Sequence, residues 1–201
     1  MTYIALYRLT NDSGFAPCID KKLLTLACCK GGQVRKGKPV NWGLRFQIGN
    51  KYNGIDYTTD NVYILGTYNK KFLYIARVTK VVTMEEYFDG MADGRTDNIY
   101  SFADGKLIRN ENLRKECVHT DELQNMRDIA GKYVLLSDDF VYLGRDAVYI
   151  DQVEKQSPVS RGHRWVSGEI AEQIVKECYK FRDGRIHKPT SPLKNHCGGC
   201  K

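Results

Sequence analysis

Two aromatic-rich runs decide the fold: Val62-Tyr63-Ile64-Leu65-Gly66-Thr67 and Phe72-Leu73-Tyr74-Ile75-Ala76-Arg77-Val78. Their β-branched and aromatic residues, separated by the short segment 68–71, predict two strands joined as a hairpin. Thr83 and Glu86 then stand at capping-box spacing and predict a short helix over residues 84–88. A hairpin that leads into a short helix suits a small β-barrel that holds a flat ligand at its rim.

The remaining periodic segments complete an α+β fold. Alternating or β-rich runs at residues 3–9, 43–49 and 133–144 predict further strands. Helical spacing predicts a helix over 120–130 and a longer amphipathic helix over 168–181. We therefore expect a curved or barrel-like mixed β-sheet of about six strands with a C-terminal amphipathic helix.

The chain length of 201 residues suits one domain with an appended tail. The sequence predicts a single α+β domain over residues 1–182. From Asp183 onward Gly, Pro, Lys and His dominate and no apolar periodicity remains, so residues 183–201 are expected to form a basic tail that contains Cys and His.

The charge of the chain favours partners that carry phosphate, such as a nucleotide or nucleic acid. Lys and Arg outnumber Asp and Glu by 31 to 24, which gives a net charge of +7. A basic run is also typical of a solvated face, so both interpretations stay open. Part of the excess lies in one segment without acids, which contains Lys21, Lys22, Lys30, Arg35, Lys36 and Lys38.

Cysteine usage and hydropathy indicate the compartment. Seven cysteines form an odd number, and the N-terminus lacks the basic and apolar regions of a signal peptide. We expect reduced thiols in a cytoplasm, which is the host cytoplasm if the chain is encoded by a phage. No apolar run approaches the roughly 20 residues that span a bilayer, so no membrane partner is expected.

Eight motifs follow one another over roughly residues 3–165. They are Ser13-Gly14-Phe15-Ala16-Pro17, Leu24-Thr25-Leu26-Ala27-Cys28-Cys29-Lys30 with Arg35, Asn61–Thr67, Leu73–Thr79, Glu86-Tyr87-Phe88, Asp97-Asn98-Ile99-Tyr100, Val134–Gly144 and Arg161-Gly162-His163-Arg164. Their order resembles a phage and bacterial family, the nucleotide modification associated domain of the second type. The segment 38–60 and the tail depart from that pattern.

The resemblance implies a link to modified nucleobases and no settled reaction. The strand-rich layout is also similar to the barrel of pseudouridine-synthase-associated (PUA) and related base-reading domains. That second likeness concerns architecture alone and implies a PUA-like fold.

Asp97, Asn98 and Tyr100 are the first candidates for ligand contact. An Asn side chain presents a donor and an acceptor to a base edge, an Asp accepts from an exocyclic amine, and a Tyr ring stacks on the base. The alternative is an Asx-turn in which Asp97 and Asn98 satisfy their own backbone.

A second group of candidates comprises Ser13, Phe15, Lys30 and Arg35. If the loop at 12–17 folds beside the basic segment, Phe15 offers a stacking face and the cations contact phosphate. The alternative places Phe15 in the core and the lysines in solvent. We expect Asp97, Asn98 and Tyr100 to lie beside Ser13–Pro17 and near His163, so that they line one concave site.

The catalytic candidates are His163 and Asp139. His163, flanked by Arg161, suits a general acid or base or a phosphate contact, although a loop histidine is often just hydrogen-bonded. His196, Cys197 and Cys200 supply only half of a zinc ligand set, so no metal site is predicted. No cofactor-binding motif is present in the sequence, and no cofactor is expected.

Three functions fit these features. The leading hypothesis is binding of a nucleotide or a modified nucleobase in a phage or bacterial DNA-modification, defence or counter-defence context. The second is a base-modifying enzyme that acts on a nucleotide or on DNA. The third is a phage protein that sequesters a signalling nucleotide, which we would expect to enclose its ligand in a homo-oligomer.

Overall fold

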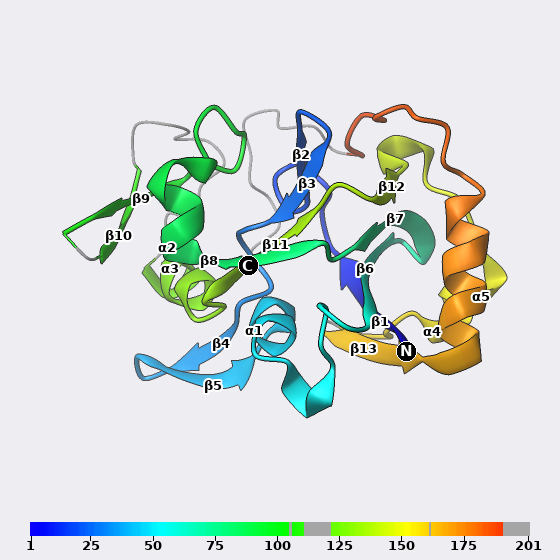
Figure 1. The fold of residues 1–201 in the computed structure, drawn as a ribbon, viewed down its shortest axis with the longest axis horizontal. Coiled ribbons are helices and arrows are strands. Elements are labelled where there is room, and N and C mark those ends of the chain that lie inside the picture. Colours follow the sequence, from blue (N-terminus) through cyan, green and yellow to red (C-terminus); the bar gives the residue numbers. More distant parts are fainter. Residues whose placement is uncertain (105, 111–121, 161, 191–201) are drawn as a thin grey trace. The chain divides into compact units, whose positions relative to one another are not determined.

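The computed structural model describes residues 1–104, 106–110, 122–160 and 162–190 (Figure 1). Contacts between Cα atoms divide the chain into two compact units. The first unit comprises residues 1–14, 53–79 and the described residues from 137 onward, and the second comprises 15–52 and the described residues of 80–136. That residues 1–182 fold as a single domain stays a prediction.

A five-stranded mixed sheet forms the centre of the first unit, in the order β12-β7-β6-β1-β13. Strands β1 and β6 pair in parallel, and the other neighbours pair antiparallel. The predicted hairpin is confirmed as β6 and β7, joined by Asn69 and Lys70 at positive φ. The strands are β1 (Thr2–Leu9), β6 (Asn61–Tyr68), β7 (Lys71–Arg77), β12 (Phe140–Tyr142) and β13 (His163–Ser167).

Helices complete the core of the first unit: the 3-10 helix η3 (Gly144–Asp146), α4 (Asp151–Gln156) and α5 (Gly168–Tyr179). The helix α5 buries Ala171, Ile174 and Cys178 at helical spacing, and these residues join Ile4 and Leu6 of β1 in one hydrophobic cluster. Burial of one apolar face, as the amphipathic pattern indicated, holds α5 to the unit.

The segment after α5 contains no helix or strand up to residue 190. It is nevertheless bonded to the first unit. The backbone N–H and the hydroxyl of Thr190 each donate to the carboxylate of Asp12 at 2.9 Å, and the N–H of Arg145 donates to the carbonyl of Lys188 at 2.9 Å.

The second unit contains a four-stranded sheet in the order β2-β3-β11-β8 and two separate hairpins, β4–β5 and β9–β10. Its strands are β2 (Cys18–Asp20), β3 (Leu23–Leu26), β4 (Gly32–Arg35), β5 (Lys38–Trp42), β8 (Lys80–Thr83), β9 (Tyr100–Ala103), β10 (Lys106–Arg109) and β11 (Tyr133–Ser137). Its helices are α1 (Leu44–Gly49), α2 (Met84–Glu86), the π-helix η2 (Tyr87–Met91) and α3 (Glu122–Ile129). The 3-10 turn η1 (Tyr52–Gly54) stands where the two units meet along the chain.

The predicted capping box is confirmed. The N–H of Glu86 donates to the hydroxyl of Thr83 at 3.1 Å, and the N–H of Thr83 donates to the Glu86 carboxylate at 2.7 Å. The α+β class is also confirmed. The described residues form four sheets and none of them closes, so the barrel-like, PUA-like sheet is not confirmed.

The strand predicted at residues 43–49 is wrong, because this segment forms α1. A strand would place Arg45 on the face opposite Leu44 and Ile48, whereas in α1 its side chain is fully buried. Its guanidinium donates to the carbonyls of Cys29, Asp128 and Tyr133 at 2.6–2.7 Å. Leu44, Arg45 and Ile48 thereby share one buried side of the helix. The hydrogen bonds of Arg45 to distant parts of the chain thus outweigh the local alternation of apolar and polar residues.

Candidate functional site

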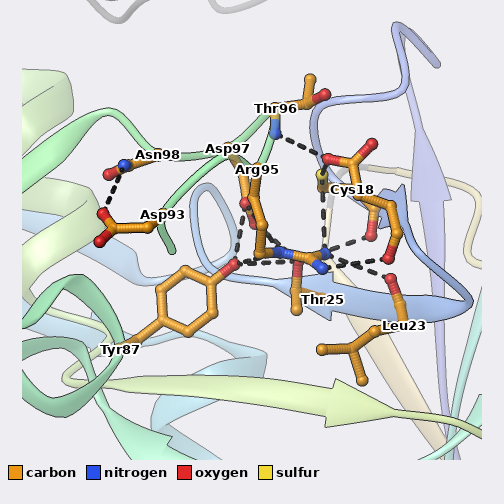
Figure 2. A network of polar contacts seen from close by, with 10 residues as sticks. Cys18, Leu23, Thr25, Tyr87, Asp93, Arg95, Thr96, Asp97 and Asn98 are labelled. Carbon is orange, nitrogen blue, oxygen red and sulfur yellow. Dashed lines mark hydrogen bonds and ion pairs between the residues drawn. The ribbon is translucent and has the colours of Figure 1, made fainter. Parts of the chain in front are cut away.

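A buried polar network in the second unit is centred on Asp97, whose side chain is fully buried (Figure 2). One carboxylate oxygen accepts from the hydroxyl of Thr25 on β3 at 2.6 Å. The other accepts from the phenol of Tyr87 on η2 at 2.8 Å. Both oxygens therefore receive hydrogen bonds from side chains, not from the backbone bonds of an Asx-turn.

Arg95 supplies the positive charge of this network. Its Nε lies 3.5 Å from the Asp97 carboxylate and donates to the Tyr87 oxygen at 2.8 Å. The two Nη atoms donate to the carbonyls of Asp20 and Leu23 at 3.1 and 3.2 Å, and one of them also donates to the Thr25 hydroxyl at 3.0 Å. Each guanidinium nitrogen thus has a protein acceptor, so Arg95 holds the loop at 92–99 to β2 and β3.

The network also fixes Asp20 and Cys18 at its edge. The Asp20 carboxylate accepts from the N–H of Thr96 at 2.7 Å and from the Cys18 thiol at 3.2 Å. Partial burial alone would raise the pKa of Asp20, but these bonds and the Arg95 charge lower the pKa below its usual value.

Burial keeps the phenol and the thiol of this network protonated. It raises the pKa of Tyr87, and the Asp97 charge raises it further. Burial and the same charge raise the pKa of Cys18. Cys18 therefore lacks the thiolate that nucleophilic chemistry needs, and Tyr87 serves as a hydrogen-bond donor.

Asn98 differs from Asp97 because its side chain is only half-buried. Its amide nitrogen donates to the carboxylate of exposed Asp93 at 3.5 Å (Figure 2). Asn98 is thus the residue of the Asp97-Asn98-Ile99-Tyr100 motif that is not buried, while Asp97 positions the loop that carries it.

Tyr100 and Phe15 lie in the core of the second unit, 1% and 5% exposed. The Tyr100 hydroxyl donates to Asp128 at 3.2 Å, and its ring meets Phe88 edge-on at 5.2 Å. Phe15 occupies the core position that the sequence left open as the alternative. Neither ring offers a base an open face, because packing against neighbouring side chains covers both.

The two predicted phosphate contacts also belong to the second unit. Lys30 is half-buried with φ of 54°, and Arg35 is exposed at the end of β4. The chain contains no Asp or Glu between residues 21 and 55. The positive charge along this stretch is therefore not offset by acids of the same stretch.

The first unit holds Ser13, Asp139 and His163. Ser13 is half-buried in the loop after β1. Asp139 is ion-paired with Arg182, and its carbonyl accepts from the Tyr179 hydroxyl at 3.1 Å. His163 begins the edge strand β13, opposite Tyr7 of β1, and its ring meets Trp165 edge-on at 6.3 Å.

The described candidates therefore divide between the two units. Phe15, Lys30, Arg35, Asp97, Asn98 and Tyr100 belong to the second unit, and Ser13, Asp139 and His163 belong to the first. Arg161 lies outside the described residues, as do His196, Cys197 and Cys200. The single concave site that draws on both groups stays a prediction.

Arg95, Thr25 and Tyr87 complete the network, and none of them was predicted. Thr25 and Tyr87 fall within the family motifs, which was their only signal. Arg95 stands in a glycine-containing loop, where an arginine is ordinarily solvent-exposed. Its burial follows from acceptors on β2 and β3, far away in the sequence.

The described residues contain no cluster of three or more His, Cys, Asp or Glu side chains suited to a metal ion. None of the helices within them has the length and apolar character to cross a membrane.

These features define an α+β protein with a buried network of Asp97, Arg95 and Tyr87. The network fixes the loop at 92–99 beside a stretch, residues 21–55, that contains cations and no acids. The family described as Nucleotide modification associated domain 2 matches residues 1–196. The chain belongs to this family. Comparison with curated proteins and with solved structures gives no match.

Proposed function

We propose that the protein binds a nucleotide or modified nucleobase as part of a nucleic acid, in a DNA-modification, defence or counter-defence context. The observation that carries this proposal is the acid-free stretch of the second unit. Lys21, Lys22, Arg35, Lys36 and Lys38 are all exposed in it. Exposed cations in a stretch of sequence that contains no acids favour phosphate through counterion release, and membership of the family supplies the nucleotide context.

The second unit offers different groups for the two parts of a nucleotide. Arg35 and Lys30 contact phosphate in this proposal, and the half-buried amide of Asn98 contacts a base edge. Asp97 acts as a positioning residue, since its carboxylate is fully buried and bonded to Thr25 and Tyr87.

The test measures binding of labelled single-stranded DNA, duplex DNA and free nucleotides to the full chain over a range of salt concentrations. Each phosphate contact contributes about −0.7 to the slope of log K against log salt for single strands and about −0.9 for duplex DNA. We expect the triple variant Arg35→Gln/Lys36→Gln/Lys38→Gln to bind more weakly and with a shallower slope.

The matched control removes three exposed cations from helices or helix ends of the first unit: Lys155→Gln/Lys176→Gln/Lys180→Gln. It changes the net charge equally and should keep the native slope. Equal losses in both triple variants would mean that net charge alone drives binding. Tight binding of a free nucleotide with little salt dependence would favour the sequestering function instead.

A further inference from the structure

Trp42 and Phe46 form a stacked aromatic pair on the second unit. Their ring centroids lie 3.7 Å apart, and the ring planes differ by 12°. Trp42 ends β5, and Phe46 lies in α1, which follows directly. The helix buries Leu44, Arg45 and Ile48 and leaves Phe46 half-buried, as Trp42 also is. The pair therefore lies where the helix meets solvent.

Neighbouring residues bond to and pack against this pair and the helix that carries Phe46. The side-chain amide of Gln47 donates to the carbonyl of Trp42 at 3.0 Å. The Tyr133 ring packs against the backbone of Gly49 so closely that a Cβ there would lie 2.2 Å from it. The Tyr133 and Phe46 centroids are 6.5 Å apart. A flat ligand would thus meet aromatic rings that are ordered beforehand, which reduces the entropy lost on binding.

One cation lies beside the aromatic pair, and two more lie at the far end of the hairpin that carries Trp42. The ammonium of exposed Lys132 lies 5.7 Å from the centroid of the Phe46 ring. Arg35 and Lys38 pair at the turn of the β4–β5 hairpin, and Trp42 pairs with Gly32 at its other end (Figure 1). Lys38 and Trp42 are four residues apart, and the rise per residue of a β-strand places them about 13 Å from each other. Within the described parts of the chain, neither Arg35 nor Lys38 makes an ion pair.

We propose that the Trp42–Phe46 pair binds an unpaired base of single-stranded nucleic acid, while the cations of the β4–β5 hairpin bind the phosphates of neighbouring nucleotides. This inference rests on the proposed function and names its ligand and its stacking residues. A base inside a duplex has both faces covered, so an aromatic surface takes only a base that has left the stack. The distance along β5 exceeds the reach of one nucleotide, which favours a strand over a mononucleotide.

The experiment titrates the full chain with a short fluorescein-labelled oligothymidylate. Trp42→Leu keeps apolar bulk but removes the aromatic ring, and we expect about 5- to 150-fold weaker binding with an unchanged salt slope. Trp42→Phe keeps a ring and should retain most of the affinity. Trp165→Phe leaves Trp42 as the single tryptophan, and its fluorescence should be quenched by the oligonucleotide.

The outcomes separate this inference from the proposed function. If the native chain binds no nucleic acid or nucleotide, both fail. If it binds with a steep salt dependence while Trp42→Leu binds equally well and Trp165→Phe shows no quenching, the stacking site is wrong and the proposed function stands. Should Trp42→Leu not fold, the quenching of Trp165→Phe decides alone.

Discussion

Asp97 in the second unit and Asp12 in the first are both buried carboxylates, 0% and 1% exposed, but different groups satisfy them. Asp97 has a guanidinium 3.5 Å away and two hydroxyl donors. Asp12 accepts from the Tyr142 phenol at 3.0 Å and from the N–H and hydroxyl of Thr190 at 2.9 Å. No cation among the described residues lies within ion-pairing distance of Asp12.

The comparison shows that a buried carboxylate can be held by opposite charge or by neutral donors alone. Arg95 stands two residues before Asp97, so that pair is local. Thr190 stands 178 residues after Asp12, so that contact joins the ends of the first unit. In both networks burial and the carboxylate raise the pKa of the tyrosine, which remains a donor.

Arg95→Met should give the largest effect, because it leaves Asp97 buried without its counter-charge. We expect the free energy of unfolding to fall by about 3–5 kcal/mol, measured by denaturant titration. The exposed substitution Lys155→Met should stay within about 0.5 kcal/mol of the native chain. Adding Asp97→Asn to Arg95→Met should cost less than the sum of the two single changes. A loss below about 1 kcal/mol would show that the charge pair is not what stabilises Asp97.

Thr190→Val should give an intermediate effect, because it removes one hydroxyl donor to Asp12 and keeps the backbone N–H. A hydrogen bond to a charged group contributes about 1.5–3 kcal/mol, and we expect a loss in that range. Thr58→Val is the matched control, since the hydroxyl of exposed Thr58 donates to the Asp56 carboxylate at 2.7 Å. Equal losses in the two variants would mean that burial of Asp12 does not strengthen its bonds.

Asp20→Asn should give the smallest effect, and one that depends on pH. The lowered pKa of Asp20 means that its ionised form stabilises the folded state above about pH 3.8. This contribution is lost as the pH falls through the folded pKa. We expect a difference on the order of 0.5 kcal/mol near neutral pH, which shrinks as the pH falls below about 3.8.

The measurement compares unfolding of Asp20→Asn and the native chain at several pH values. Asp89→Asn removes one exposed negative charge from the same unit and controls for net charge. A difference that grows on acidification would contradict the assigned direction of the Asp20 shift.

The elements with local signals were predicted well. The β6–β7 hairpin and the Thr83–Glu86 capping box depend on neighbouring residues, which a single sequence displays. Helix α1 was not predicted, because the carbonyls to which buried Arg45 donates belong to residues 29, 128 and 133. The sequence around residue 45 does not show these acceptors. Separate sheets in place of one barrel likewise reflect long-range pairing that local patterns do not contain.

The sequence singled out polar residues of the candidate site, but it did not predict what each of them does. Asp97 and Asn98 were identified as polar residues beside aromatics, but burial assigns them different tasks. Residues 183–201 were expected to form a tail because they lack apolar periodicity, yet Thr190 bonds to Asp12. A single specific contact leaves no periodic pattern, so the sequence alone does not reveal it.

The position of β1 in the five-stranded sheet has a consequence for synthesis of the protein. β1 is made before both of its partners, because its parallel partner β6 begins at Asn61 and its antiparallel partner β13 begins at His163. Contacts so distant in sequence form slowly, and domains assemble as the chain emerges from the ribosome. A nascent chain that stops before β13 therefore leaves one edge of β1 unpaired and open to association with other chains.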